Sequence, residues 1–270
     1  KAIAKADLEK QLDFALDIQR RAPFSEQLTI PEETGSELLA HVISLNKVTI
    51  STDSFGTIIS LNDSASLEMR YYRNNILHTY GLISLVCKLL THNRKIAQKQ
   101  LTEQTISILA TLKDDLFLWQ TPEEMTQQVI QVLAFLEQSE TAKRDTDECW
   151  SLTNDTRQLS YIHHMAECID ESLQRLAIIT SLATRLEPLT RRDLEQKVVA
   201  IAKRLAVLNN ITAPEFIDKK AQATLINTLR EQNYIKLNDE GLLMTTDTMK
   251  ELKTSVTNLV AVEVLQSIAR

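Results

Sequence analysis

Apolar residues recur at helical spacing along most of this chain, and three short stretches interrupt that spacing. Helices are expected at residues 4–20, 36–45, 67–90, 101–117, 122–135, 156–186, 194–208, 214–232 and 249–268. Residues 48–61, 141–152 and 235–244 instead have the alternation and the polar turn residues of two-stranded hairpins. The pattern therefore predicts a mainly α-helical fold with three small hairpins.

The same order of elements returns with a period of about 93 residues. The first helices begin near residues 7, 100 and 193, and the hairpin turns centre near residues 54, 146 and 239. A fixed period of supersecondary units is typical of an array. We therefore predict three winged-helix-like units of two helices and a hairpin, at residues 1–95, 96–188 and 189–270, connected by long helices.

The stretch from residue 67 to residue 90 joins a polar front end to the most apolar helix of the chain. Its second half is apolar on every side, which is typical of a helix inside a large core, and it is too short to span a bilayer. The polar front end, residues 70–75, indicates a docking surface. An ordinary solvent-exposed first turn of a helix would show the same spacing of polar residues. The candidate docking residues are Tyr71, Tyr72, Arg73, Asn74, Asn75 and His78.

Composition narrows the class of protein. The hydrophobic fraction of 43% is enough for a core. The small numbers of glycines (four) and prolines (five) disfavour a β-rich fold, because such a fold needs many turns. Three distant cysteines are typical of reduced thiols in the cytosol. We expect no signal peptide and no transmembrane segment, and the start without Met in the middle of a helical pattern indicates a piece of a longer protein.

Motifs for catalysis and for cofactors are missing. The chain has neither a Gly-x-Ser-x-Gly elbow nor a glycine-rich phosphate loop, so we expect no cofactor. His163, His164 and Cys168 come close enough in sequence to ligate a metal, but no second ligand pair accompanies them. They are more simply a polar helix face, and no metal is expected. Trp119, close to Pro122, is expected to anchor a core at a helix junction.

Nucleic acid is not an expected partner. The net charge of −6 disfavours broad phosphate binding. The third unit has cations on its second helix in the manner of a DNA-binding module, but Asp239 and Glu240 make its hairpin turn acidic. A stand-alone winged-helix-like array that binds protein or DNA is the alternative interpretation of the whole chain.

Six segments carry a family resemblance. They are Ala-Pro-Phe-Ser at 22–25, Tyr-Tyr-Arg-Asn-Asn-Ile-x-His at 71–78, Leu-Phe-Leu-Trp at 116–119, Ala-Lys-Arg-Leu-Ala-Val-Leu at 202–208, Ile-Thr-Ala-Pro-Glu-Phe-Ile-Asp-Lys at 211–219 and Leu-Arg-Glu-Gln-Asn-Tyr-Ile at 229–235. In this order they resemble the C-terminal third of membrane-bound bacterial glycerol-3-phosphate 1-O-acyltransferases. Residues 139–160 match that family least.

The resemblance implies a parent enzyme on the cytoplasmic face of the bacterial inner membrane. Such an enzyme transfers an acyl group from acyl-CoA or acyl carrier protein to glycerol-3-phosphate and makes lysophosphatidic acid for phospholipid synthesis. Its His-x4-Asp catalytic pair is missing here, because none of the five histidines has an acidic residue five positions later. We therefore expect no catalytic residue in this chain, which by itself would be inactive. It would be a structural or regulatory domain that docks on the upstream acyltransferase domain and on the membrane surface.

Overall fold

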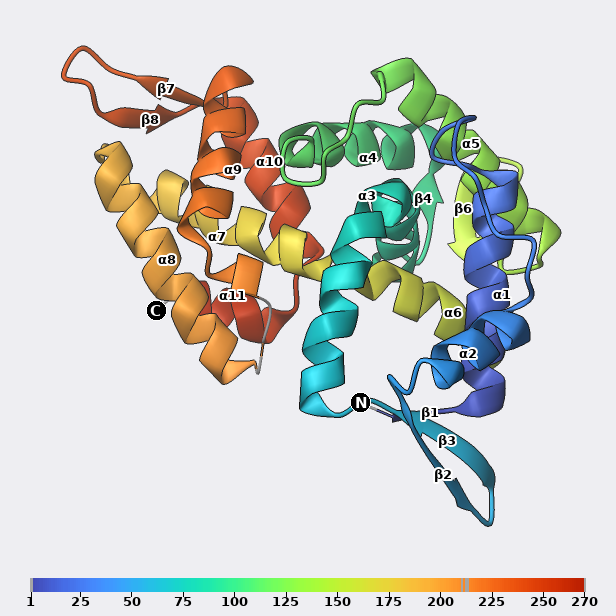
Figure 1. Ribbon diagram of the computed structural model, residues 1–270. Coiled ribbons are helices and arrows are strands. Elements are labelled where there is room, and N and C mark those ends of the chain that lie inside the picture. The colour runs from blue at the N-terminus through green and yellow to red at the C-terminus, as the bar shows by residue number, and fades with distance from the viewer. Residues whose placement is uncertain (1, 210, 212–213, 270) are drawn as a thin grey trace.

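The computed structural model describes residues 2–209, 211 and 214–269, and within them the fold is mainly helical, as predicted (Figure 1). The helices are α1 (Lys5–Arg21), α2 (Gly35–Ser44), α3 (Asp63–His92), α4 (Gln98–Leu112), α5 (Pro122–Gln138), α6 (Thr156–Glu167), α7 (Asp170–Leu186), α8 (Arg191–Leu208), a 3-10 turn η1 (Pro214–Phe216), α9 (Lys219–Glu231), α10 (Asp247–Asn258) and α11 (Val262–Ala269).

All three predicted hairpins are confirmed. They pair β2 (Thr49–Asp53) with β3 (Gly56–Ser60), β5 (Ala142–Arg144) with β6 (Cys149–Leu152), and β7 (Ile235–Leu237) with β8 (Leu243–Thr245), each antiparallel. The first two hairpins each gain a third strand, β1 (Ala2–Ala4) on β3 and β4 (Ile96–Ala97) on β6. Strands of three and two residues are too short to show an alternation, so the sequence did not reveal them.

Three of the predicted helices are each divided in the structure, and the helix predicted at 101–117 ends early, at Leu112. The helix predicted at 214–232 consists of the 3-10 turn η1 and, from Lys219, the helix α9. The helix predicted at 156–186 ends at Glu167 and starts again at Asp170, and the closing helix predicted at 249–268 breaks between Asn258 and Val262. The prediction of one continuous helix at each of these two places was wrong. Both halves of each pair bury apolar side chains in the same core, so the apolar spacing continues through the bend and does not mark it.

The buried centre lies around the second half of α3. Leu82, Ile83, Leu85, Val86, Cys87, Leu89 and Leu90 are each at most 1% exposed. This half packs among α4, α5 and α6, as the apolar pattern predicted. Because each fully buried aliphatic side chain contributes about 1.5–3 kcal/mol, this segment holds the first half of the fold together.

The C-terminal half packs around α7, which leads away from the α3 region and lies against α8, α10 and α11 (Figure 1). Helix α4 contacts α9 and α10 from the other side. Most of the buried apolar side chains in the described residues form one cluster that extends from Phe14 to Ile268. The division into units at 1–95, 96–188 and 189–270 stays a prediction. In the described part of the chain no helix is both long and apolar enough to cross a membrane.

Helices α1 and α2 approach each other closely at Gly35. The Gly35 amide donates a 2.6 Å hydrogen bond to a carboxylate oxygen of Asp13, and a Cβ at Gly35 would lie 2.1 Å from the main-chain oxygen of Glu9. Thr34 caps α2 and forms a capping box with Glu37. The first residue of α2 thus docks this helix directly onto the backbone of α1.

Candidate docking surface

The candidate docking residues lie on the first half of α3, which extends away from the buried core. Tyr71 and Tyr72 are 68% and 54% exposed, and their rings pack edge to face with centroids 6.0 Å apart. Asn75 is also exposed, and the neighbouring Ile76 is 53% exposed. The structure therefore brings two aromatic rings, an amide and an aliphatic side chain together on one solvent-facing stretch.

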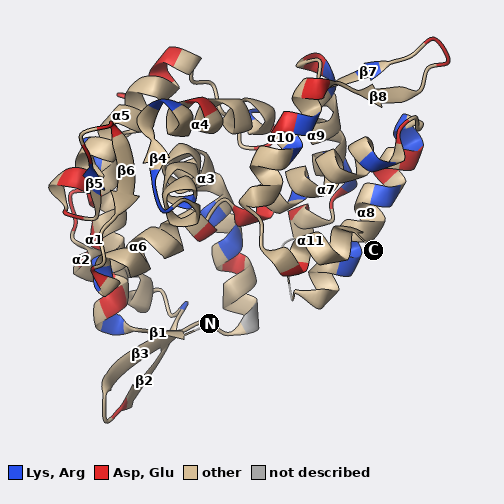
Figure 2. Cartoon of the chain, turned by 180° about the vertical axis from the view of Figure 1, so that it is seen from behind, with Lys and Arg blue, Asp and Glu red and all other residues tan. Residues whose placement is uncertain are grey.

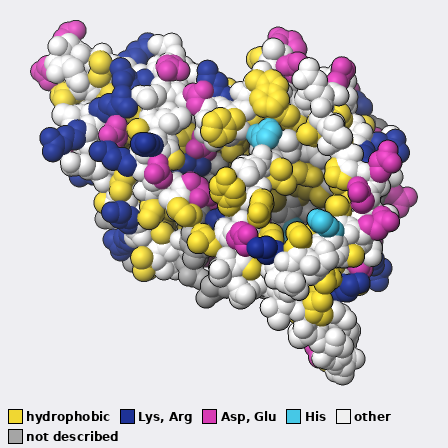
Figure 3. Space-filling model, viewed as in Figure 1, with side chains coloured by type: hydrophobic (Ala, Val, Ile, Leu, Met, Phe, Trp, Pro, Cys, Tyr) yellow, Lys and Arg dark blue, Asp and Glu magenta, His cyan; other side chains and the backbone are white. Residues whose placement is uncertain are grey.

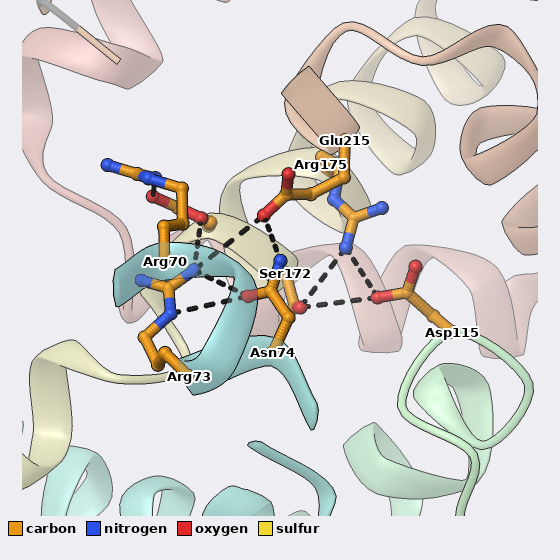
Figure 4. Close-up of polar contacts among 8 residues, drawn as sticks. Arg70, Arg73, Asn74, Asp115, Ser172, Arg175 and Glu215 are labelled. Carbon is orange, nitrogen blue, oxygen red and sulfur yellow. Dashed lines mark hydrogen bonds and ion pairs between the residues drawn. The ribbon is translucent and has the colours of Figure 1, made fainter. Parts of the chain in front are cut away.

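Arg73 and Asn74, in contrast, are bound within the chain. The Arg73 guanidinium donates to Glu171 at 2.9 Å and to the Asn74 side-chain oxygen at 3.0 Å, and Arg70 also pairs with Glu171 (Figure 4). The Asn74 amide donates to Glu215 at 2.8 Å. These contacts connect α3 to α7 and to η1, so both side chains contribute to the fold as well as to the candidate surface.

Glu171 is the common partner of the two arginines and is 23% exposed. Burial raises the pKa of Glu171, but Arg73 and Arg70 together outweigh burial and hold this pKa below its ordinary value. The ionised carboxylate is therefore favoured in the folded chain. Its position in the first turn of α7 adds to this preference, because the helix dipole favours a negative charge there.

The pH dependence of stability follows from this lowered pKa. A carboxylate with a lowered folded-state pKa stabilises the chain above its unfolded pKa, and this contribution is lost as the pH falls through the folded value. We expect wild type to exceed Glu171→Gln in unfolding free energy by a constant amount above about pH 5, and the difference to shrink below about pH 4. Urea unfolding of both proteins at several pH values measures it. A difference that grows on acidification would contradict the assignment.

His78 supports an exposed aromatic cluster. Its ring packs 5.3 Å from Phe24 and 5.7 Å from Trp119, and the Phe24 and Trp119 rings meet edge to face at 4.6 Å. Trp119 is 63% exposed, so the prediction that it anchors a core was wrong. Hydrophobic side chains gather beside a histidine where α3 and the segment after α4 meet (Figure 3). Trp119 lies outside the core because Phe24, which is 4% exposed, occupies the buried position there and packs against the Trp119 ring.

Phe117, two residues before Trp119, has an unusual backbone. It adopts φ 55°, and its side chain is 79% exposed. The Leu118 amide donates back to the Lys113 carbonyl, which closes a turn in which the left-handed position usually holds glycine or asparagine. A large apolar side chain is thus held in solvent by a conformation that non-glycine residues seldom adopt.

Next to this surface lies a cavity of about 280 Å³ that both charged and apolar side chains line. Its walls come from α3, from the turn after α4, from the start of α7, and from η1 and α9. Arg175, which is 5% exposed, donates a 2.6 Å bond to Asp115, and Asp115 also accepts from Ser172 at 3.2 Å (Figure 4). Sequence reasoning missed this buried pair. The signal in the sequence was Arg175 directly before the apolar run of residues 176–179 in α7.

Metal-binding geometry is not found in the part of the chain that the structure describes, where no three His, Cys, Asp or Glu side chains could share an ion. His164 instead lies against the Ser160 carbonyl at 2.7 Å, and Cys168 is hydrogen-bonded to the main chain of its own helix.

A separate apolar groove of about 540 Å³ lies between α1, β3, α3 and α6. Acidic and basic residues are scattered over many of the helices, with several cations along α8 (Figure 2).

Known proteins similar to this chain include glycerol-3-phosphate acyltransferases. The family description "Glycerol-3-phosphate acyltransferase C-terminal region" matches residues 1–238. The chain is 63% identical over its whole length to a glycerol-3-phosphate acyltransferase of Colwellia psychrerythraea, and it covers 33% of that protein. It is 31% identical to one of Pseudoalteromonas atlantica over 98% of the chain and 33% of the relative. A relative from Aeromonas hydrophila is 35% identical over 87% of the chain and 29% of its own length.

The predicted resemblance is thereby confirmed, and the chain spans about a third of the length of the curated relatives that it matches. The family match covers all six segments of the sequence analysis and does not include residues 239–270. The chain belongs to the glycerol-3-phosphate acyltransferase family and corresponds to the C-terminal region of these enzymes.

Proposed function

We propose that this chain is the structural and regulatory C-terminal part of a glycerol-3-phosphate 1-O-acyltransferase and is inactive by itself. The parent enzyme would transfer an acyl group from acyl-CoA or acyl carrier protein to glycerol-3-phosphate. The observation that carries the proposal is the 63% identity over the whole chain to an acyltransferase of which the chain covers only 33%. Since no histidine here has a carboxylate at the His-x4-Asp spacing, the upstream part of the polypeptide would supply the base.

The chain would dock on that upstream part through Tyr71, Tyr72, Arg73, Asn74, Asn75 and His78. Exposed tyrosines and arginines are enriched among the residues that dominate binding energy at interfaces. The buried second half of α3 fixes the first half in place, so little conformational entropy would be lost on contact. The assembly would lie at the cytoplasmic face of the inner membrane as a peripheral structure.

Removal of the two exposed rings tests this docking role. In the full-length parent enzyme, acyltransferase activity of the double variant Tyr71→Ala/Tyr72→Ala is expected to fall about 30-fold. This corresponds to the loss of about 2 kcal/mol of docking free energy, the size of an interface hot spot. The thermal unfolding midpoint of the isolated 270-residue chain should stay unchanged, because both rings are mostly in solvent. Turnover of palmitoyl-CoA and glycerol-3-phosphate measures the first effect, and the isolated chain should give only background turnover.

Phe55 provides the matched control. It is an aromatic residue that is 97% exposed at the tip of the β2–β3 hairpin, away from α3 (Figure 1). Phe55→Ala should leave the full-length enzyme as active as wild type. Full activity of the tyrosine double variant would reject the docking role, and saturable turnover by the isolated chain would reject the assignment of catalysis to the upstream part.

A further inference from the structure

Helix α8 is cationic in a chain that is acidic overall. It has five lysines and arginines and two acids, whereas the whole chain has a net charge of −6. Both acids lie near its start, where Asp193 accepts a hydrogen bond from the capping Thr190 and Glu195 pairs with Arg191 at 2.8 Å. Beyond Glu195 the helix has cations and no acid as far as its end at Leu208.

Three of these cations, Lys197, Lys203 and Arg204, lie on the exposed side of α8, opposite the buried Ala202 and Leu205. None of the three forms an ion pair or a side-chain hydrogen bond with a residue that the structure describes. Lys and Arg side chains gather on the left of Figure 3, where Figure 1 places α8. Unpaired cations on one face favour an anionic partner from outside the chain.

Neighbouring segments do not cancel this charge. After α8, Glu215 is hydrogen-bonded to α3 at 2.8 Å, and Asp218 caps α9. Helix α9 packs against α8 and begins with the exposed Lys219 and Lys220. Helix α11, which also contacts α8, adds one acid, the exposed Glu263. Cations therefore outnumber acids around the second half of α8.

The same helix ends in two aliphatic side chains that lie in solvent. Val207 is 83% exposed and Leu208 is 59% exposed. They come four positions after Lys203 and Arg204, so each lies next to a cation on the helix surface. Cations beside aliphatic side chains on one face are typical of a helix that lies in the interface of a membrane. Nucleic acid fits less well, because α8 has no aromatic side chain on which a base could stack.

We propose that the exposed face of α8 from Lys197 to Leu208 binds the surface of an anionic lipid bilayer. Lys203 and Arg204 would pair with lipid phosphates, and Val207 and Leu208 would enter the boundary between headgroups and acyl chains. The inference deepens the proposed function and rests on its membrane part, because it names the surface through which the peripheral assembly would meet the bilayer.

Sedimentation with lipid vesicles tests the α8 face. The 270-residue chain is mixed with vesicles of phosphatidylglycerol and phosphatidylethanolamine, or with vesicles of phosphatidylcholine alone. We expect binding to the anionic vesicles only, and we expect added salt to weaken it. The variant Lys197→Gln/Lys203→Gln/Arg204→Gln should bind about 100-fold more weakly, because each cation near an anionic surface contributes about fivefold.

A second triple variant is the matched control. Lys10→Gln/Lys99→Gln/Lys143→Gln removes the same charge from exposed positions outside α8 and should bind the vesicles as wild type does. Circular dichroism confirms that both variants are folded, because all six side chains lie in solvent. Equal losses in the two triple variants would show that only the net charge matters and would overturn the α8 face.

Removal of the aliphatic end tests the contact with hydrocarbon. Val207→Ser/Leu208→Ser keeps every cation and should weaken vesicle binding about tenfold, because less apolar area leaves water. Unchanged binding of this variant would overturn the entry of these side chains into the bilayer.

The remaining outcomes separate lipid from other anionic partners. Wild type and the α8 triple variant are also mixed with a single-stranded oligonucleotide and with apo acyl carrier protein. Binding of either that requires the α8 cations, without binding to anionic vesicles, would overturn the lipid surface. Vesicle binding that the α8 triple variant retains would overturn the role of α8. Neither result affects docking on the upstream part, which turnover by the Tyr71 and Tyr72 variant measures separately.

Discussion

Replacement of Asp115 by alanine is expected to lower the unfolding free energy of the chain by about 3–5 kcal/mol, because it leaves the Arg175 charge buried without its partner. Both side chains of this pair are 6% exposed, and the Arg175 Nη2 to Asp115 Oδ2 distance is 2.6 Å. The pair joins the turn after α4 to α7, which lie 60 positions apart in the sequence. Urea unfolding followed by circular dichroism measures the loss.

Two further variants show whether the charge, rather than the shape, causes this loss. The double variant Asp115→Leu/Arg175→Met removes both charges and keeps apolar volume, so it should recover most of the stability. The exposed pair of Lys99 and Glu103, with side chains 87% and 66% exposed, is the surface control, and Glu103→Ala should cause no measurable change. An Asp115→Ala protein as stable as wild type would show that water compensates the Arg175 charge.

Gly35→Ala is expected to destabilise the chain by about 3 kcal/mol, at the upper end of the cost of overpacking. An alanine in a helix would normally gain about 0.5–1 kcal/mol over glycine. Here the added Cβ would lie 2.1 Å from the main-chain oxygen of Glu9 and 3.0 Å from the main-chain nitrogen of Asp13. Backbone atoms of α1 cannot rotate away, so α2 would have to shift and strain the bond from Gly35 to Asp13.

Gly81 provides the comparison within the same chain. It lies inside α3, and a Cβ there would meet only the end of the Leu116 side chain, at 3.4 Å. Gly81→Ala should therefore leave stability unchanged or raise it slightly, because helix propensity acts without a backbone clash. Thermal unfolding of both variants measures the contrast. Equal effects at the two positions would show that the contact between α1 and α2 is not close enough to matter.

The sequence determined most of the local structure and the family. Helical spacing located the helices, and polar turn residues located all three hairpins, because these features depend on neighbours along the chain. The exposed position of Tyr71, Tyr72 and Asn75 also follows from the polar front end before the apolar run. The roles of these side chains in docking stay a prediction.

Tertiary packing decided the helix bends, the long-range ion pairs and the burial of individual side chains, which local sequence patterns do not specify. The bends after Glu167 and after Asn258 occur within continuous apolar spacing, so only the arrangement of the neighbouring helices reveals them. The contact between Arg73 and Glu171 spans 98 positions, and no feature of either segment specifies the other. The buried Arg175 and the exposed Phe117 have side chains whose usual locations are the reverse. Their positions depend on which distant helices meet, because burial is a property of the packed chain and not of the residue.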